Sequence, residues 1–164
     1  MNQIKHIKSS YTIGIIIESN GVTRKQQLIS CIIDYVISKE YRNFQKLHIL
    51  IAIRNSYEYS LAQQLISYKI LHHNLYVELL ITENQENRLK KNANCNTFSI
   101  INTADCYNTI HITFPTDLYR KLVHYMAQKC DKILYEINYP WQIKLLYSVA
   151  NHNNIPTISV SSEL

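Results

Sequence analysis

The chain has 164 residues, of which 46% are hydrophobic and 18% are charged, and its formal net charge is +5. This length is enough for one domain with its own hydrophobic core, and the composition argues against intrinsic disorder. No apolar run approaches the roughly 20 residues that cross a bilayer, and the polar segment MNQIKHIKSS does not resemble a signal peptide, so we expect a single cytoplasmic domain.

Short apolar runs typical of strands alternate with helical patterns along the whole chain. In chain order, these patterns predict a strand at 12–18, a helix around 28–36, a strand at 47–53, a helix beginning near Glu58, a strand at 76–81, an ambiguous segment at 85–103, a strand at 107–112, a helix around 118–126, a strand at 132–137, a helix opened by Pro140 and a strand at about 156–160. The apolar stripes of four helices place Val36, Leu65, Met126 and Leu145 in the core.

This alternation predicts an α/β fold, a three-layer Rossmann-like domain with a mainly parallel sheet of about five to six strands. Segments such as TIGIII and HILIAI are nearly continuous apolar runs, as expected of strands that are buried on both faces. In the last helix, the apolar stripe consists of Trp141, Leu145 and Val149.

Neither the cysteines nor the basic residues form a binding motif. The cysteines lack the CxxC spacing that brings zinc ligands together, so we expect no metal and no cofactor; they are Cys31, Cys95, Cys106 and Cys130. The basic residues are dispersed apart from a short run at 88–91. Because nucleic-acid binding needs a basic stripe with interleaved aromatic residues, we do not expect a nucleic-acid partner.

The expected fold sorts the polar loops between the two ends of the sheet. In such sheets, ligands bind beyond the carboxyl ends of the strands, where the strand order reverses. The loops expected on that rim are 18–21, 54–58, 82–85 and 138–141. Asp105 and Asp131 precede their strands, so we expect them at the opposite end, where an aspartate usually ties down a turn.

The rim turn after the second strand reads Arg54-Asn55-Ser56-Tyr57 and contains no glycine. Glycine at such a turn supplies positive φ and lets backbone N–H groups approach a phosphate. Its absence leaves three interpretations: a site that has lost its chemistry, a site rebuilt with side chains, or a plain connection.

Several motifs point to a known family when they are taken together. They are the turn from Ala52 to Glu58, Lys69 at the end of the next helix, Gln85 after the third strand, Phe98 with Ala104-Asp105, and Met126 five residues before Asp131. On these motifs, residues 12–160 resemble the SLOG superfamily (the Smf/DprA and LOG-like Rossmann domains), and most of all its YpsA-like branch. The resemblance also favours a helix within 85–103.

The chain departs from this family at its glycines. Ala52 and Ser56 stand where the family's turn has glycine, and Glu58 stands in place of its aspartate. The stretch 138–141 replaces a glycine-threonine segment, and the PGGxGT phosphate motif of the LOG enzymes is absent. Close backbone contact with a phosphate is therefore unfavourable at this turn.

The resemblance implies a small domain that binds a nucleotide-derived ligand in a regulatory or sensing role without catalysis. The expected ligand-binding residues are Asn20, Gly21, Arg54, Asn55, Ser56, Glu58 and Gln85. Arg54 is the expected anchor because its guanidinium offers a bidentate fork to a phosphate or carboxylate. The simpler alternative is that Arg54 and Glu58, four residues apart, pair with each other at the surface.

Two other functions stay open on the sequence alone. One is a degenerate SLOG-like scaffold that acts through protein–protein contacts, with a homo-oligomer or another protein as its partner. The other is a hydrolase of N-glycosidic bonds in nucleotides, which would need a carboxylate near the sugar and an acid for the leaving base. The carboxylates on the expected rim are Glu18, Glu58 and Glu83.

Overall fold

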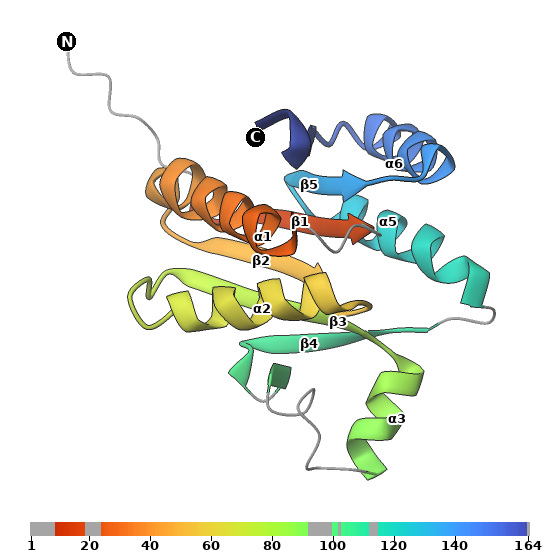
Figure 1. Cartoon of the computed structure of the whole chain (residues 1–164), viewed down its shortest axis with the longest axis horizontal. Coiled ribbons are helices and arrows are strands. Elements are labelled where there is room, and N and C mark those ends of the chain that lie inside the picture. Colours follow the sequence, from red (N-terminus) through yellow and green to blue (C-terminus); the bar gives the residue numbers. More distant parts are fainter. Residues whose placement is uncertain (1–8, 19–23, 92–99, 102, 112–114, 164) are drawn as a thin grey trace.

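The computed structural model describes residues 9–18, 24–91, 100–101, 103–111 and 115–163. Six parallel strands form one sheet in the order β4-β3-β2-β1-β5-β6 (Figure 1). They are β1 (Tyr11–Glu18), β2 (Leu47–Ala52), β3 (Leu75–Thr82), β4 (Cys106–Ile110), β5 (Lys132–Ile137) and β6 (Thr157–Ser159). The predicted α/β fold with a parallel sheet of five to six strands is therefore confirmed.

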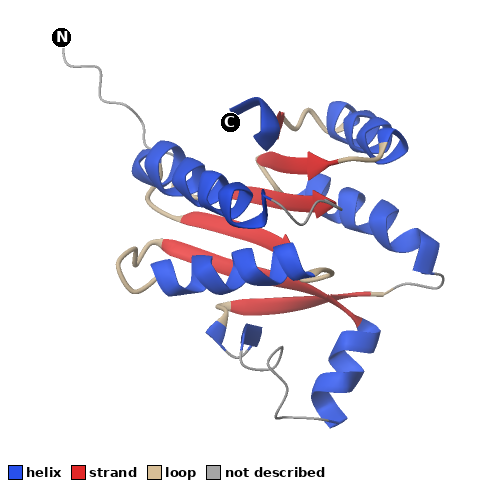
Figure 2. Cartoon of the chain, viewed as in Figure 1, coloured by secondary structure: helices blue, strands red, loops and turns tan. Residues whose placement is uncertain are grey.

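Helices cover both faces of this sheet, as Figure 2 shows. They are α1 (Lys25–Asp34) and α2 (Ser56–Tyr68) on one face, and α5 (Leu118–Lys129) and α6 (Pro140–His152) on the other, whereas α3 (Glu83–Lys91) follows directly on the end of β3. The helix α1 runs on into a π-helical turn at Tyr35–Glu40 and a 3₁₀ turn at Tyr41–Asn43. Within the ambiguous segment, the structure confirms a helix up to Lys91, whereas residues 92–99, including Phe98, lie outside the described residues.

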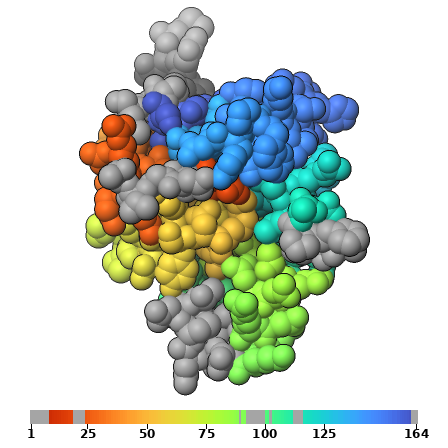
Figure 3. Space-filling view, turned by 45° about the vertical axis from the view of Figure 1, so that its right-hand side comes forward, coloured from red at the N-terminus to blue at the C-terminus, as the bar shows by residue number. Residues whose placement is uncertain are grey.

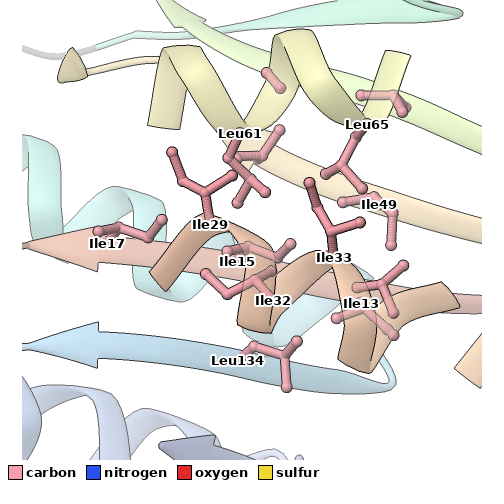
Figure 4. Packing of buried hydrophobic residues seen from close by; sticks show 14 of the residues in the cluster. Ile13, Ile15, Ile17, Ile29, Ile32, Ile33, Ile49, Leu61, Leu65 and Leu134 are labelled. Atoms are coloured by element: carbon pink, nitrogen blue, oxygen red, sulfur yellow. The ribbon is translucent and has the colours of Figure 1, made fainter. Parts of the chain in front are cut away.

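The sheet carries one hydrophobic cluster on each face. The apolar stripes of α1 and α2 pack onto alternate residues of β1, namely Ile13, Ile15 and Ile17 (Figure 4). The intervening residue Ile16 faces the cluster that α5 and α6 form on the other side. Val36, Leu65 and Met126 are fully buried, as predicted.

The register of α6 differs from the prediction. Its buried residues are Gln142, Leu146, Val149 and Ala150, whereas Trp141 is 56% exposed and Leu145 is only partly buried. The predicted stripe used steps of four residues, and each such step turns about 40° further around a helix of 3.6 residues per turn. Trp141 and Leu145 consequently lie off the side of α6 that faces the sheet.

The strand order places the switch point between β1 and β5. From β1 the chain builds outward through β2, β3 and β4, and then returns to the other side of β1 with β5 and β6. The carboxyl ends of β1 and β5 lie side by side, because the backbone N–H of Asn138 donates to the carbonyl of Glu18 at 3.3 Å. This is where an open parallel sheet offers a crevice for a ligand.

The opposite end of the sheet is closed by two aspartates. Asp131 accepts the backbone N–H of Thr12 at 2.9 Å, and Asp105 accepts that of Val77 at 2.7 Å. Asp105 also pairs with Lys69 at 2.6 Å. Both aspartates thus cap the start of a neighbouring strand, which confirms their predicted structural role. Among the described helices, none is long and apolar enough to cross a membrane.

Candidate functional site

The turn after β2 is organised by Asn55, the N-cap residue of α2. Its backbone is extended, with φ −138° and ψ 173°, and its Oδ1 accepts the N–H groups of Tyr57 and Glu58 at 3.0 Å each. Its Nδ2 donates to the carbonyl of Ile17 in β1 at 2.8 Å. The turn needs no positive φ at Asn55, and one side chain caps the helix and joins it to the sheet. This explains how the turn forms without glycine.

Glu58 lies beneath this turn with no exposed surface. Four donors converge on its carboxylate: the backbone N–H of Ile17 at 3.3 Å, and the backbone N–H, Nε and Nη2 of Arg54, the first two at 3.0 and 3.1 Å. The remaining arm of Arg54, Nη1, pairs with Glu18 at the end of β1. The simpler alternative predicted that Arg54 and Glu58 pair at the surface. They do pair, but the prediction of a surface position is wrong, because the side chain of Arg54 is only 11% exposed and that of Glu58 is fully buried.

Burial and pairing act against each other in this group of three charges, which we call the rim network: Glu18, Arg54 and Glu58. Burial opposes the charge of Arg54, but the carboxylates of Glu58 and Glu18 outweigh that cost and raise the pKa of the guanidinium. Complete burial raises the pKa of Glu58, while Arg54 and the backbone N–H groups favour its ionised form. With two carboxyl groups around one guanidinium, the side chain of Arg54 is fully engaged within the rim network.

Gln85 makes a second side-chain link at the same rim. Its Oε1 accepts the backbone N–H of Thr82 at 2.9 Å, and its Nε2 donates to the carbonyl of Ile53 at 2.7 Å. The start of α3 is thereby tied to the chain just beyond β2. Ser56 is exposed at the start of α2, and its carbonyl accepts the hydroxyl of Ser60 at 2.8 Å.

The structure therefore brings most of the expected ligand-binding residues to one end of the sheet. Arg54, Asn55 and Glu58 interlock around the end of β1, and Gln85 joins them from the β3 side. The expected residues Asn20 and Gly21 lie outside the described residues. Figure 3 turns this end of the sheet toward the viewer, with the segments after β2 in yellow, α5 in teal and α6 in blue.

On the β5 side of the switch point, a buried glutamine was missed by sequence reasoning. Gln142 sits in the first turn of α6 and is only 6% exposed. Its side-chain Oε1 is buried and has no hydrogen-bond partner among the described residues. Almost all buried polar atoms in proteins are paired, so an orphan acceptor beside the switch point is an unusual feature. The sequence offered no signal for it, because the packing of α6 decides which of its residues face the sheet.

One aromatic residue, Tyr119, lies between Gln142 and the rim network. The hydroxyl of Tyr119, in α5, donates to the backbone carbonyl of Gln142 at 3.1 Å, and its ring meets Trp141 edge-on at 5.5 Å between centroids. Burial raises the pKa of Tyr119, and the charges of Arg54 and Glu18 also act on it. Tyr119 therefore stands between the two sides of the switch point.

The described residues do not place three or more His, Cys, Asp or Glu side chains where they would hold a metal ion. The chemistry that the site offers is hydrogen bonding: one orphan acceptor, a partly exposed carboxylate in Glu18, and aromatic surface from Trp141 and Tyr139, which are 56% and 40% exposed.

Comparisons with known proteins add little to this geometry. No protein-family model matches the chain, and no curated protein matches it. Among solved structures, the chain has a weak likeness to unliganded arylmalonate decarboxylase, with 12% identity over 93% of this chain and 88% of that one and a TM-score of 0.24. A second likeness is to the ABC domain in complex with L-Trp from Streptococcus pneumonia, with 10% identity over 93% of this chain and 74% of that one and a TM-score of 0.23. Likenesses this weak carry no argument about function.

Proposed function

We propose that this protein is a SLOG-like domain that binds a nucleotide-derived small molecule at the switch point, in a regulatory or sensing role and without converting it. The observation that carries the proposal is the buried, unpaired Oε1 of Gln142. A buried acceptor without a partner costs about 1–3 kcal/mol, which a ligand donor would recover. The site lies where open parallel sheets bind ligands. Our expectation of a cytoplasmic protein belongs to the same proposal.

The polar groups on the rim favour the nucleoside part of such a ligand over its phosphates. Gln142 needs a donor, such as the amino group of a base or a ribose hydroxyl. Arg54 is held by both carboxyl groups of the rim network, so its guanidinium offers no free fork to a phosphate. Trp141 and Tyr139 expose enough ring surface to stack on a base. Phosphates would then point toward Arg24 and Lys25 at the start of α1.

The state of the rim carboxylates argues against cleavage of an N-glycosidic bond. That reaction needs a carboxylate free to approach the sugar. Glu58 is fully buried with four donors on it, Glu18 pairs with Arg54, and Glu83 pairs with His111. Incubation with nucleoside monophosphates should release no free base. Release that disappears in Glu58→Gln would identify the protein as a hydrolase instead.

Binding is tested by native mass spectrometry of the purified protein for a co-purified ligand, followed by titration calorimetry with nucleosides and their mono- and diphosphates. Gln142→Met keeps the side-chain length but removes the acceptor, and should weaken binding about tenfold or more, the equivalent of about 1.4 kcal/mol. The matched control is Gln128→Met, an exposed glutamine of α5, which should bind like the unmodified protein. Equal affinity in both variants would remove Gln142 from the site.

A non-catalytic scaffold is the second candidate, and one observation favours it. The side chains of Arg54, Asn55 and Gln85, which were expected to bind a ligand, already make hydrogen bonds within the chain. A scaffold predicts no saturable binding of any nucleoside or nucleotide, so the same titrations separate the two candidates.

A further inference from the structure

The strand β4 forms one edge of the sheet and keeps its outer side unprotected in the described structure. Among the described strands it pairs only with β3, and its sequence, CYNTI, contains no charged residue and no proline. Cys106 and Asn108 are exposed, and Tyr107 is 45% exposed. The other edge strand, β6, has only three residues and runs directly into a 3₁₀ turn. Natural sheets usually protect a free edge with charge, proline or shortness, and β4 has no charge and no proline.

The backbone groups that β4 offers to a partner can be assigned residue by residue. The N–H of Asp105 donates to the carbonyl of Val77 in β3 at 3.0 Å. Successive residues of a strand direct their N–H and C=O groups to opposite sides, so Tyr107 and Thr109 also face β3. Cys106, Asn108 and Ile110 consequently direct theirs outward, and no described residue pairs with them there.

We propose that two copies of the protein pair through β4 in antiparallel orientation, about a two-fold axis that passes through Asn108. Asn108 then faces its own copy, and Cys106 faces Ile110 of the second copy. These outward-facing residues form about six inter-chain hydrogen bonds in the antiparallel ladder. Tyr107 faces Thr109 of the second copy, an aromatic and β-branched pair of the kind that stabilises adjacent strands. The sheet becomes continuous through the dimer.

The charges at the two ends of β4 favour a second copy in this orientation. At the start of the strand, Glu78 and Asp105 outnumber the one cation beside them, Lys69. An antiparallel pair brings that acidic end next to the other end of β4 in the second copy, and places Asp105 opposite His111. A surface that complements itself in this way is what a two-fold dimer requires.

The other end of β4 is basic and hollowed. A groove of about 480 Å³ separates it from α5, and the described lining contains Arg120 and Lys121 but no carboxylate. Two carboxylates lie beside this end, Glu83 against His111 and Glu86 against Thr109 and Lys90, so Arg120, Lys121 and Lys90 outnumber them by one. Within one copy, Glu78 of β3 lies beside Cys106, and its side chain is on the face of the sheet that α5 covers. In the dimer, Cys106 of the second copy faces Ile110, which lines the groove, so Glu78 of the second copy approaches this groove.

The test is the mass of the protein in solution, measured by sedimentation equilibrium over a concentration series. The unmodified protein should form dimers. Asn108 donates to Glu78 of its own chain, and Asn108→Lys keeps a donor there while it sets two lysines near each other across the axis. It should raise the dimer dissociation constant about tenfold or more, while circular dichroism stays unchanged. The matched control Asn151→Lys, an exposed position on α6, should dimerise normally. A monomer at every concentration, or a dimer unaffected by Asn108→Lys, would overturn the proposal.

The register is tested separately by disulfide trapping in the Cys106→Ser background. Mixing Tyr107→Cys copies with Thr109→Cys copies should give a cross-linked dimer, because facing Cβ atoms in such a pair lie about 4.5–5.5 Å apart. Neither variant alone should cross-link to the same extent. Equal cross-linking of the single variants would contradict the proposed axis. Because no nucleotide takes part in either experiment, failure here leaves the proposed ligand site untouched, and the reverse also holds.

Discussion

The two ends of the sheet use similar polar residues but differ in how completely they satisfy them. At the amino end of the strands, Asp105 and Asp131 each cap a neighbouring strand. At the carboxyl end, Glu58 accepts a backbone N–H of β1 in the same way and Asn55 donates to a carbonyl of β1, yet Gln142 keeps an unpaired buried acceptor. The difference teaches that a polar residue at a strand end is weak evidence for a ligand, because most such residues hold the fold together. The orphan acceptor is the more informative feature.

The largest effect is expected from breaking the rim network. Glu58→Leu should lower the free energy of unfolding by about 3–5 kcal/mol, because the buried guanidinium of Arg54 keeps only Glu18 as a counter-ion and its Nε and Nη2 lose their acceptor. Denaturant unfolding measures the loss. The double variant Arg54→Met/Glu58→Leu should recover most of it, since no buried charge is then left unpaired and Glu18, which loses its partner, is partly exposed to water. A loss below about 1 kcal/mol in the single variant would show that Arg54 simply turns out to solvent.

The corresponding change at the amino end should cost less. Asp131→Ala removes the acceptor of the Thr12 N–H, and a hydrogen bond to a charged group contributes about 1.5–3 kcal/mol. Asp34→Ala, an exposed aspartate at the end of α1, is the matched control and should change the unfolding free energy by less than about 0.5 kcal/mol. Equal effects at the two positions would mean that the cap at β1 adds nothing to stability.

Substitutions of Asn55 distinguish its two contributions to stability, the cap of α2 and the hydrogen bond to β1. Asn55→Ala should cost about 1–2 kcal/mol, the typical value for losing an N-cap together with one further hydrogen bond. Asn55→Ser retains a capping oxygen but cannot reach the carbonyl of Ile17, so it should recover only part of the loss. Full recovery with serine would show that the bond to β1 contributes little. Thermal and denaturant unfolding of the three proteins give the comparison.

The sequence predicts the fold well because its signals are local. Apolar runs and helical stripes depend on near neighbours, and the strand β5 was predicted at its observed limits, 132–137. The placement of Asp105 and Asp131 also follows from chain order alone. The register of α6 does not, because Trp141, Leu145 and Leu146 are all apolar and the sheet and α5 decide which of them is buried.

The candidate site was predicted only in part because its decisive contacts join distant segments. The spacing of Arg54 and Glu58 indicates a pair, but their burial depends on Ile17 and Glu18 in β1, which lie 36 to 41 residues away in sequence. Nothing local indicates that Asn55 reaches Ile17. The orphan acceptor of Gln142 exists only because α6 turns that residue inward, so no pattern in the sequence isolates it.

The smallest expected effect is the sharpest test of the difference between the two ends. Without ligand, Gln142→Met should leave the unfolding free energy unchanged or raise it by up to about 1 kcal/mol, because it replaces an unpaired buried acceptor with an apolar side chain of similar length. Gln128→Met, at an exposed position, should change it by less than about 0.5 kcal/mol in either direction. Every polar residue that serves only the fold should behave in the opposite way: the protein should lose stability when the polar atoms of that residue are removed, as expected for Asp131 and Asn55.

A loss above about 1 kcal/mol in Gln142→Met would show that its Oε1 is paired in solution, for instance by a water molecule. The rim would then be as closed as the amino end of the sheet, and the scaffold would become the better account of the protein.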